Sequence, residues 1–573
     1  MLNDIDNEYI ENDVKVPYGI SDFLKLINSK CHFADKSHFI KEIINDSAEV
    51  ILITRPRRFG KTLNLSMLYY FLQQNFPQKE NIFKNLAISQ DINFCKKYQN
   101  QHPVIFITFN EIKEDTFKDA KDKISTLISE LYTEHQYLLE GDTLHEHEKK
   151  IFSQLLNEEA SKSHIQGAIK KLALYMERKY KKLPIILIDE YDTPIQTAYL
   201  KGYYPKMITF MRGILGQALK DNKIIQKAIV TGITRVAQES LFSGINNLEV
   251  YSLLREKYGQ YFGFTETEVI KLITETKQEV SLQEIKGWYN GYQIGQYTLY
   301  NPWSIISCLK NNGKFQPYWL TTSSNDLVKE LIDKVDYSVK GEFELMLQGK
   351  TIEKPLLENL IFPELKEKEE AVWSLLLYAG YLNVSSSEIK GFQLMAQVSI
   401  PNREVMYVYD GIVAGWFRKG TSLDSYKKFI QSLKLGEIAT FKKYLSEILD
   451  IGSYFDFNKN TPERVFHSFM LGLTVGLKDE YIIQSNQEAG LGRFDVVFIP
   501  KNKQLKGILL EFKTTDSVDS LINKAKEALD QIKDKQYFQI FKQHDVKNIL
   551  AIGLAFCGKQ IELAHEEIKL DLP

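Results

Sequence analysis

Five residues at the ends of two apolar segments have the types and order of a phosphate-binding site. Gly60, Lys61 and Thr62 follow one apolar segment and precede another with helical spacing, which is the setting of a phosphate-binding loop. In such a loop, backbone N–H groups hold the phosphates, the lysine reaches the β and γ phosphates, and the threonine binds Mg²⁺. Asp189 and Glu190 end a later apolar segment. Asp189 would hold Mg²⁺ near Thr62, and Glu190 would orient and deprotonate the attacking water.

The phosphate-binding loop has an unusual composition. The usual motif carries a glycine five positions before Gly60, and this chain has Arg55 there. The alternative interpretation is a helix N-terminus that contains Gly-Lys-Thr by chance, but the acidic pair at 189–190 favours nucleotide binding. We therefore predict ATP and Mg²⁺ as cofactors. The expected nucleotide-binding residues of the loop are Arg57, Arg58, Phe59, Gly60, Lys61 and Thr62.

Three residues beside the other apolar segments could complete this site. Thr231 is a polar residue at the end of the apolar segment 227–233 and could sense the γ-phosphate. Arg235 could place its guanidinium on a phosphate, in cis or in trans, or it could form a surface ion pair. Asp192 could lie near the metal, although a turn or N-cap role fits its position better.

A second constellation near the C-terminus combines two carboxylates with a lysine. Glu511 and Lys513 are two positions apart in an apolar segment, so their side chains share one face of the expected strand. Asp495 begins the preceding apolar segment, and a turn centred near Lys503 places it opposite Glu511 in an antiparallel hairpin. Carboxylate oxygens suit Mg²⁺, which can activate water and stabilise charge on a phosphate that is being cut. The alternative is an ordinary charged solvent face of a sheet.

Each residue of this second constellation has a predicted role. Asp495 and Glu511 are expected to be metal ligands and catalytic residues, and Lys513 is expected to position the water or offset charge. Glu463, on an expected helix before the hairpin, could add a metal ligand. His467, one helical turn later, could line the cleft, or it could be a partly buried histidine with a satisfied partner.

The apolar segments that position these residues alternate with amphipathic ones. We expect buried strands at 50–54, 103–109, 184–189 and 227–233, and a long helical stretch at 119–181. Such strands indicate a parallel sheet covered on both faces, which binds its ligand at the carboxyl ends of the strands. The C-terminal part is expected to contain the hairpin of Asp495 and Glu511, a helix at 524–534, and a last strand at 548–557.

The N-terminal half resembles the bacterial AAA-ATPase-like proteins related to archaeal-type ATPases. The resemblance covers about residues 15–330, and the loop RPRRFGKT is itself typical of that family. It implies that Arg55 does not disable the loop, and that FADKSHFI (33–40) lies beside the nucleotide base. The matching segments are 17–23, 33–40, 55–62, 187–192, 231–248 and the aromatic stretch 287–303.

The C-terminal part resembles the PD-(D/E)xK nuclease superfamily, as found at the C-terminus of the same ATPase family. The matching order is a helix with Glu463, then GLGRFD, then LLEFK, then the helix KAKEALDQI, over about residues 460–555. Gln531 matches a glutamine that some members place on the helix after the lysine. The aromatic partner, Tyr537, lies farther along the chain than the spacing of exonuclease-type members. The resemblance therefore gives little support to an exonuclease.

The predicted fold class is α/β: a P-loop NTPase with a parallel sheet, a helical middle region, and a C-terminal α/β domain of the restriction-endonuclease type. The expected domains are an N-terminal arm at 1–16, a P-loop AAA-like ATPase domain at 17–248, a helical lid region at 249–345, a small mixed α/β linker domain at 346–425, and a nuclease-like domain at 426–573.

Bulk properties fit a cytoplasmic protein. The net charge is −2, so any contact with nucleic acid must rest on local patches. The four cysteines are dispersed and indicate a reducing compartment, and no segment approaches about 20 uninterrupted apolar residues, so no membrane contact is expected. The expected function is an ATP-hydrolysing protein with a Mg²⁺-dependent nuclease domain. Its expected partners are DNA or RNA and further copies of the chain. The alternative is an NTP-driven switch whose nuclease-like domain only binds nucleic acid or protein.

Overall fold

The chain divides into two compact units. The first contains residues 1–328 and 353–405, and the second contains residues 329–352 and 406–573. The expected N-terminal arm falls mostly outside the described residues. The computed structural model describes residues 14–74, 81–235, 241–242, 245, 247–319, 342–343, 345–346, 349–359, 361–409, 423–451, 463–477, 479–485, 488–489 and 492–570.

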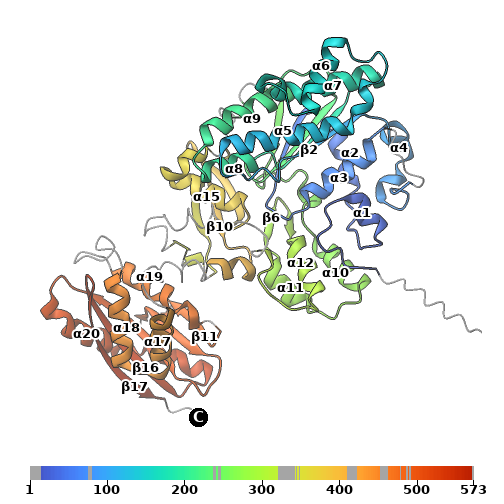
Figure 1. Ribbon diagram of the computed structural model, residues 1–573. Coiled ribbons are helices and arrows are strands. Elements are labelled where there is room, and N and C mark those ends of the chain that lie inside the picture. Colours follow the sequence, from blue (N-terminus) through green and yellow to red (C-terminus); the bar gives the residue numbers. More distant parts are fainter. Residues whose placement is uncertain are drawn as a thin grey trace, which may run out of the picture. The chain divides into compact units, whose positions relative to one another are not determined.

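The first unit is built on a five-stranded parallel sheet, with helices packed around it on both sides (Figure 1). The four predicted strands are present, and three of them, β1, β3 and β4, are buried along their whole length, as their continuous apolar runs predict. A fifth strand, β5, begins at residue 248, where we expected the domain to end. In sheet order the strands are β2 (Val104–Thr108), β3 (Ile185–Asp189), β4 (Lys227–Gly232), β1 (Val50–Thr54) and β5 (Leu248–Tyr251).

Some helices in this unit begin at a residue whose side chain caps the first turn. The predicted helical stretch 119–181 is divided into three α-helices, and the side chains of Thr116 and Ser161 cap the first and third of them. The α-helices up to residue 219 are α1 (Phe23–Asn28), α2 (His38–Asn45), α3 (Lys61–Leu72), α4 (Ile92–Tyr98), α5 (Phe117–Glu134), α6 (Glu146–Leu156), α7 (Lys162–Tyr180), α8 (Thr193–Leu200) and α9 (Tyr204–Leu219).

The predicted helix-rich region, 249–345, belongs to the same compact unit as far as residue 328, and it packs on the phosphate loop. Phe59, in that loop, is fully buried. Its ring packs edge-on against the ring of Tyr292, with 4.9 Å between the two ring centroids. Its carbonyl accepts a hydrogen bond from the backbone N–H of Gly263 at 3.2 Å. The elements of the region are α10 (Glu266–Glu275), α11 (Leu282–Tyr289), the hairpin strands β6 (Tyr292–Ile294) and β7 (Tyr297–Leu299), and α12 (Pro302–Lys310).

The small mixed segment forms a three-stranded sheet in the order β8-β10-β9, with one helix, α15 (Glu369–Tyr378). The strands are β8 (Ile352–Leu356), β9 (Asn383–Lys390) and β10 (Gln393–Ser399). Glu404 follows this sheet and is fully buried. Its carboxylate accepts hydrogen bonds from the Ser304 hydroxyl at 2.7 Å and from the Trp319 backbone N–H at 2.8 Å. Burial raises the pKa of Glu404 from 4.5 to about 7.

The Glu404→Gln variant should lose part of the pH dependence of folding stability. Because the folded-state pKa is raised, the folded protein holds a proton that the unfolded chain has released, so stability falls as pH rises from about 4.5 to 7. The shift corresponds to about 3 kcal/mol. Urea unfolding measures the effect: the free energy of unfolding of the variant, relative to that of the wild type, should be higher at pH 8 than at pH 5.5. The exposed Glu140→Gln control should show no such gain, and equal gains in both variants would contradict the prediction.

The second unit contains a five-stranded mixed sheet in the order β11-β14-β15-β16-β17, in which only the β15–β16 pair is parallel. The expected last strand, β16 (Asn548–Cys557), is followed after a two-residue turn by β17 (Gln560–Lys569), so our expectation that the sheet ended there was wrong. The alternating polar residues of β17 suit an edge strand with one exposed face. The other strands are β11 (Tyr481–Ser485), β14 (Val496–Pro500) and β15 (Gly507–Thr514).

Helices cover both faces of this second sheet. Apolar residues of α17, α18 and α19 pack with Phe498, Leu510 and Phe556 on one face. On the other face, α20 and the segment 537–546 pack with Val497, Leu509 and other strand residues. None of the described helices in either unit is long and apolar enough to span a bilayer. The four helices are α17 (Leu423–Leu435), α18 (Ile438–Ile451), α19 (Glu463–Thr474) and α20 (Leu521–Asp534).

Candidate nucleotide and metal sites

The phosphate loop joins β1 to the N-terminus of α3. Gly60 is the N-cap of α3 and has φ +83°, a conformation that only glycine adopts without strain. The Lys61 ammonium is buried and donates to the carbonyls of Arg55 and Pro56, each at 3.1 Å. Burial lowers the pKa of Lys61, and the charges of Glu190 and Asp189 partly offset this. The ammonium is therefore held by weak neutral acceptors in its own loop, which a phosphate group would replace with a stronger, charged partner.

Asp189 links the phosphate loop to the neighbouring strands. Its carboxylate is fully buried and accepts hydrogen bonds from the hydroxyls of Thr62 at 2.7 Å and Thr231 at 2.6 Å. Burial raises its pKa, and these two hydrogen bonds oppose that rise. The structure therefore brings together Thr62 and Asp189, the predicted metal ligands, with Thr231, the predicted γ-phosphate sensor. Hydroxyl and carboxylate oxygens form a donor set that fits Mg²⁺.

Glu190 and Asp192 have different roles in the turn after β3. Glu190 lines the cavity beside the loop with φ +50°, a strained conformation for a residue other than glycine, and its carboxylate accepts from the Thr193 hydroxyl at 3.3 Å. Asp192 is fully buried and accepts from the backbone N–H groups of Ile233 at 3.0 Å and Thr234 at 2.9 Å. Asp192 thus ties this turn to the end of β4, as a turn role predicts.

Two arginines lie apart from the phosphates' expected position. Arg235 is outside the cavity lining and forms an ion pair with Glu358 at 3.6 Å, as the alternative interpretation predicts. Arg55, at the position of the missing glycine, is completely buried, and its guanidinium donates to the carbonyls of Thr54 and Tyr251, each at 2.8 Å. Burial lowers the pKa of Arg55 to about 9. Its side chain therefore leaves the loop and anchors it to β5, which sequence reasoning missed because the anchor is a backbone carbonyl.

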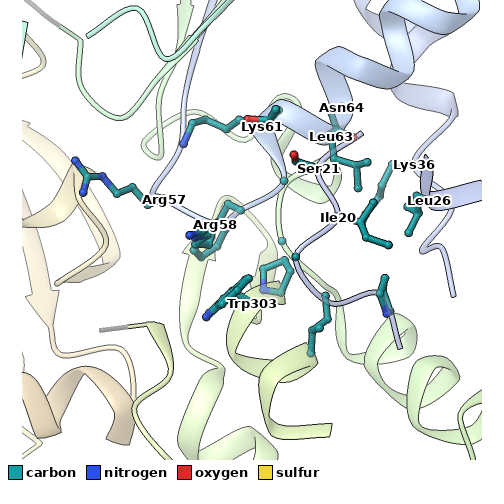
Figure 2. Close-up of a pocket in the computed structure, with 18 of the residues that line it drawn as sticks. Ile20, Ser21, Leu26, Lys36, Arg57, Arg58, Lys61, Leu63, Asn64 and Trp303 are labelled. Atoms are coloured by element: carbon teal, nitrogen blue, oxygen red, sulfur yellow. The ribbon is translucent and has the colours of Figure 1, made fainter. Parts of the chain in front are cut away.

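A cavity of about 480 Å³ opens beside this loop (Figure 2). Its lining includes the phosphate loop with the polar residues Glu190 and Asn110. It also includes Phe33 and Ala34 of the FADKSHFI segment, which the resemblance places beside the nucleotide base. Lys36 of the same segment is tied to Glu268 of α10 by an ion pair of 2.6 Å. A lining that combines a phosphate loop with apolar side chains suits a nucleotide.

The second site forms on the β14–β15 hairpin. Val496 pairs with Leu510 in the antiparallel register, and one step further places Asp495 opposite Glu511, as predicted. The carboxylates converge: Glu511 accepts from the Asp495 backbone N–H at 3.3 Å, and Asp495 accepts from the Phe512 backbone N–H at 2.7 Å. Burial raises the pKa of both carboxyls, and the charge of Asp495 raises that of Glu511 further. A bound cation would relieve this repulsion.

Lys513 lies among the carboxylates of this second site. Its positive charge lowers the pKa values of Glu511, Asp495 and Glu463 against the larger effect of burial. Glu463 is thus electrostatically coupled to the site, but no group of three metal-ligating side chains forms among the residues that the structure describes. Glu463 as a third ligand stays a prediction, and the donor set seen here fits Mg²⁺ through two carboxylates only.

Three further residues form hydrogen bonds around Asp495 and Glu511, and Gln531 is the one that contacts a carboxylate. His467 is buried, and its Nε2 lies 3.1 Å from the Asp495 carbonyl, to which it donates as the Nε2–H tautomer. The Gln531 amide on α20 donates to Glu511 and to the Tyr537 hydroxyl. The structure thus joins Gln531 and Tyr537 despite their unusual spacing, because residue 537 begins a short 3₁₀ segment that packs back against the sheet.

Two family models match separate parts of the chain. A family model described as "Predicted AAA-ATPase" matches residues 17–242, and one described as "PD-(D/E)XK nuclease superfamily" matches residues 461–566. The chain is 25% identical over 536 residues to "Uncharacterized protein in vnfD 5'region" of Azotobacter chroococcum mcd 1. The aligned region covers 91% of this chain and 93% of that protein. The Walker-type ATPase PABY2304 of Pyrococcus abyssi aligns with a TM-score of 0.35 and 12% identity, over 66% of this chain and 96% of that one.

Proposed function

Because the chain combines a predicted AAA-ATPase domain with a domain of the PD-(D/E)XK nuclease superfamily, we propose that it hydrolyses ATP and cleaves nucleic acid in a Mg²⁺-dependent reaction. The observation that carries the proposal is the convergence of Asp495 and Glu511 on one hairpin, in the same chain as the Thr62–Asp189–Thr231 cluster. We further propose that it acts in the cytoplasm on DNA or RNA, and that it assembles with further copies of itself.

The residues of the first site have complementary roles in ATP hydrolysis. Lys61 would exchange its loop carbonyls for the β and γ phosphates, and Asp189 would keep the Thr62 hydroxyl in place. Glu190 would take a proton from the attacking water. Mg²⁺, when bound at either site, would offset phosphate charge.

The residues of the second site would handle a phosphodiester. Asp495 and Glu511 would hold the metal once both are ionised, and His467 and Gln531 keep the hairpin and the Glu511 carboxylate oriented. Lys513, on the same strand face as Glu511, would position the water or offset the charge that develops on the cleaved phosphate.

A regulatory switch without cleavage is the second candidate. The observation that favours it is that no group of three side chains able to hold a metal ion forms among the described residues of the hairpin site. In that case the second unit would bind nucleic acid or protein under nucleotide control.

A cleavage assay distinguishes the two candidates. The full chain should cut a mixture of single- and double-stranded DNA and RNA when Mg²⁺ is present, and EDTA should stop the reaction. Parallel reactions with and without ATP would report nucleotide control. Mobility shifts without cleavage over the same Mg²⁺ range would contradict nuclease activity and support the binding module.

A further inference from the structure

Arg58 occupies an unusual position in the phosphate loop. It lies two residues before Gly60 with φ +67°, a strained conformation for any residue other than glycine. Its guanidinium carbon lies 4.5 Å from the centre of the Trp303 indole, and both side chains line the nucleotide cavity. Figure 2 shows the two stacked on each other within the cavity lining. The strained loop therefore directs this arginine into the cavity.

The partner of Arg58 is an aromatic face and not a carboxylate. Among the described residues no ion pair is formed by Arg58, although its environment includes the charge of Glu190. A guanidinium that rests on an aromatic ring is held weakly compared with one that binds an anion. An arriving phosphate would therefore draw the guanidinium from the indole.

The other arginines near the site are engaged elsewhere. Arg235 pairs with Glu358 outside the cavity, and Arg55 is buried beneath the loop. Arg57 donates to Gln196 at 3.4 Å and extends away from the Arg58–Trp303 pair (Figure 2). Of the arginines at this site, Arg58 is thus the one whose guanidinium is held within the cavity by an aromatic partner alone.

We propose that Arg58 is a catalytic residue that neutralises the triphosphate from within its own chain, and that Trp303 holds it in place until nucleotide binds. The inference rests on the proposed ATPase function. In the reaction, water oxygen forms a bond to the γ-phosphorus while the bond from that phosphorus to the β–γ bridging oxygen breaks. ADP leaves with the electron pair, the water proton passes to Glu190, and Arg58 offsets the charge on the phosphate oxygens.

The kinetic test compares two substitutions of Arg58. Arg58→Met keeps the length of the side chain but removes the charge, and should lower kcat for ATP hydrolysis by about 100-fold or more, with a smaller change in ATP affinity. Arg58→Lys should recover part of kcat. Arg57→Met is the matched control from the same loop and should lower kcat less. Equal kcat in Arg58→Met and the wild type would overturn the proposal.

A spectroscopic test follows the release of Trp303. Tryptophan emission of the full chain should change when ATP saturates the site, and the change should be absent in Trp303→Phe, which keeps the other four tryptophans. It should also be absent in Arg58→Met at ATP concentrations that calorimetry shows to be saturating. Calorimetric ATP binding to the wild type without any emission change would overturn this proposal alone. No ATP binding by the wild type would overturn the proposed ATPase function as well.

Discussion

The Lys61→Ala variant is expected to bind ATP about 10- to 100-fold more weakly than the wild type. A hydrogen bond to a charged group contributes about 1.5–3 kcal/mol, and this substitution removes one of the charged donors of the loop. The loop itself should survive, because Lys61 donates only to carbonyls of its own loop, whereas Arg55 and Phe59 hold that loop to the surrounding core. Isothermal titration calorimetry with ATP and Mg²⁺ measures the effect.

Two companion variants make this result specific. Glu190→Gln should bind ATP normally but hydrolyse it about 100- to 10,000-fold more slowly, because only the general base is lost. Lys41→Ala, which removes an exposed lysine paired with Asp91, should bind and hydrolyse ATP as the wild type does. Unchanged ATP affinity in Lys61→Ala would show that the glycine-poor loop is not a phosphate-binding loop.

The Asp495→Ala variant should lose nucleic-acid cleavage and keep ATP hydrolysis. Loss of one of the two convergent metal ligands should remove several kcal/mol of the stabilisation that the metal gives to the transition state of cleavage. This corresponds to a fall in cleavage rate of at least about 1000-fold. ATP hydrolysis should persist because Asp189, Glu190 and Lys61 lie in the other compact unit. The two rates are measured on the same preparation, by phosphate release and by loss of labelled substrate.

A matched control is available in the same unit. Asp545 is exposed and forms an ion pair with Lys503, away from the converging carboxylates, so Asp545→Ala should cleave at the wild-type rate. Circular dichroism should show that both variants are folded. A folded Asp495→Ala protein that has lost ATP hydrolysis would contradict two independent sites, and one that still cleaves would remove Asp495 from the mechanism.

The local sequence was sufficient for most of the secondary structure and for both motifs. Continuous apolar runs predicted β1 to β4, because strands buried on both faces must be apolar throughout. Counting eight residues to either side of Lys503 gave the register of Asp495 opposite Glu511, because the register of a hairpin follows from the position of its turn. The strand β17 was missed because polar residues interrupt its apolar ones, so its sequence contains no continuous apolar run.

Only the tertiary structure decided which arginines face the nucleotide cavity. Arg55 and Arg58 in RPRRF and Arg235 in VTGITR all carry a guanidinium close to the expected nucleotide site, and the sequence alone does not show which of them contacts the cavity. In the folded chain they diverge, because Arg55 donates to the Tyr251 carbonyl of β5, Arg58 lies over the Trp303 ring, and Arg235 forms an ion pair with Glu358. These partners lie far away in the sequence, and side-chain periodicity carries no information about them. The roles of long charged side chains depend on contacts that form only when distant segments pack together.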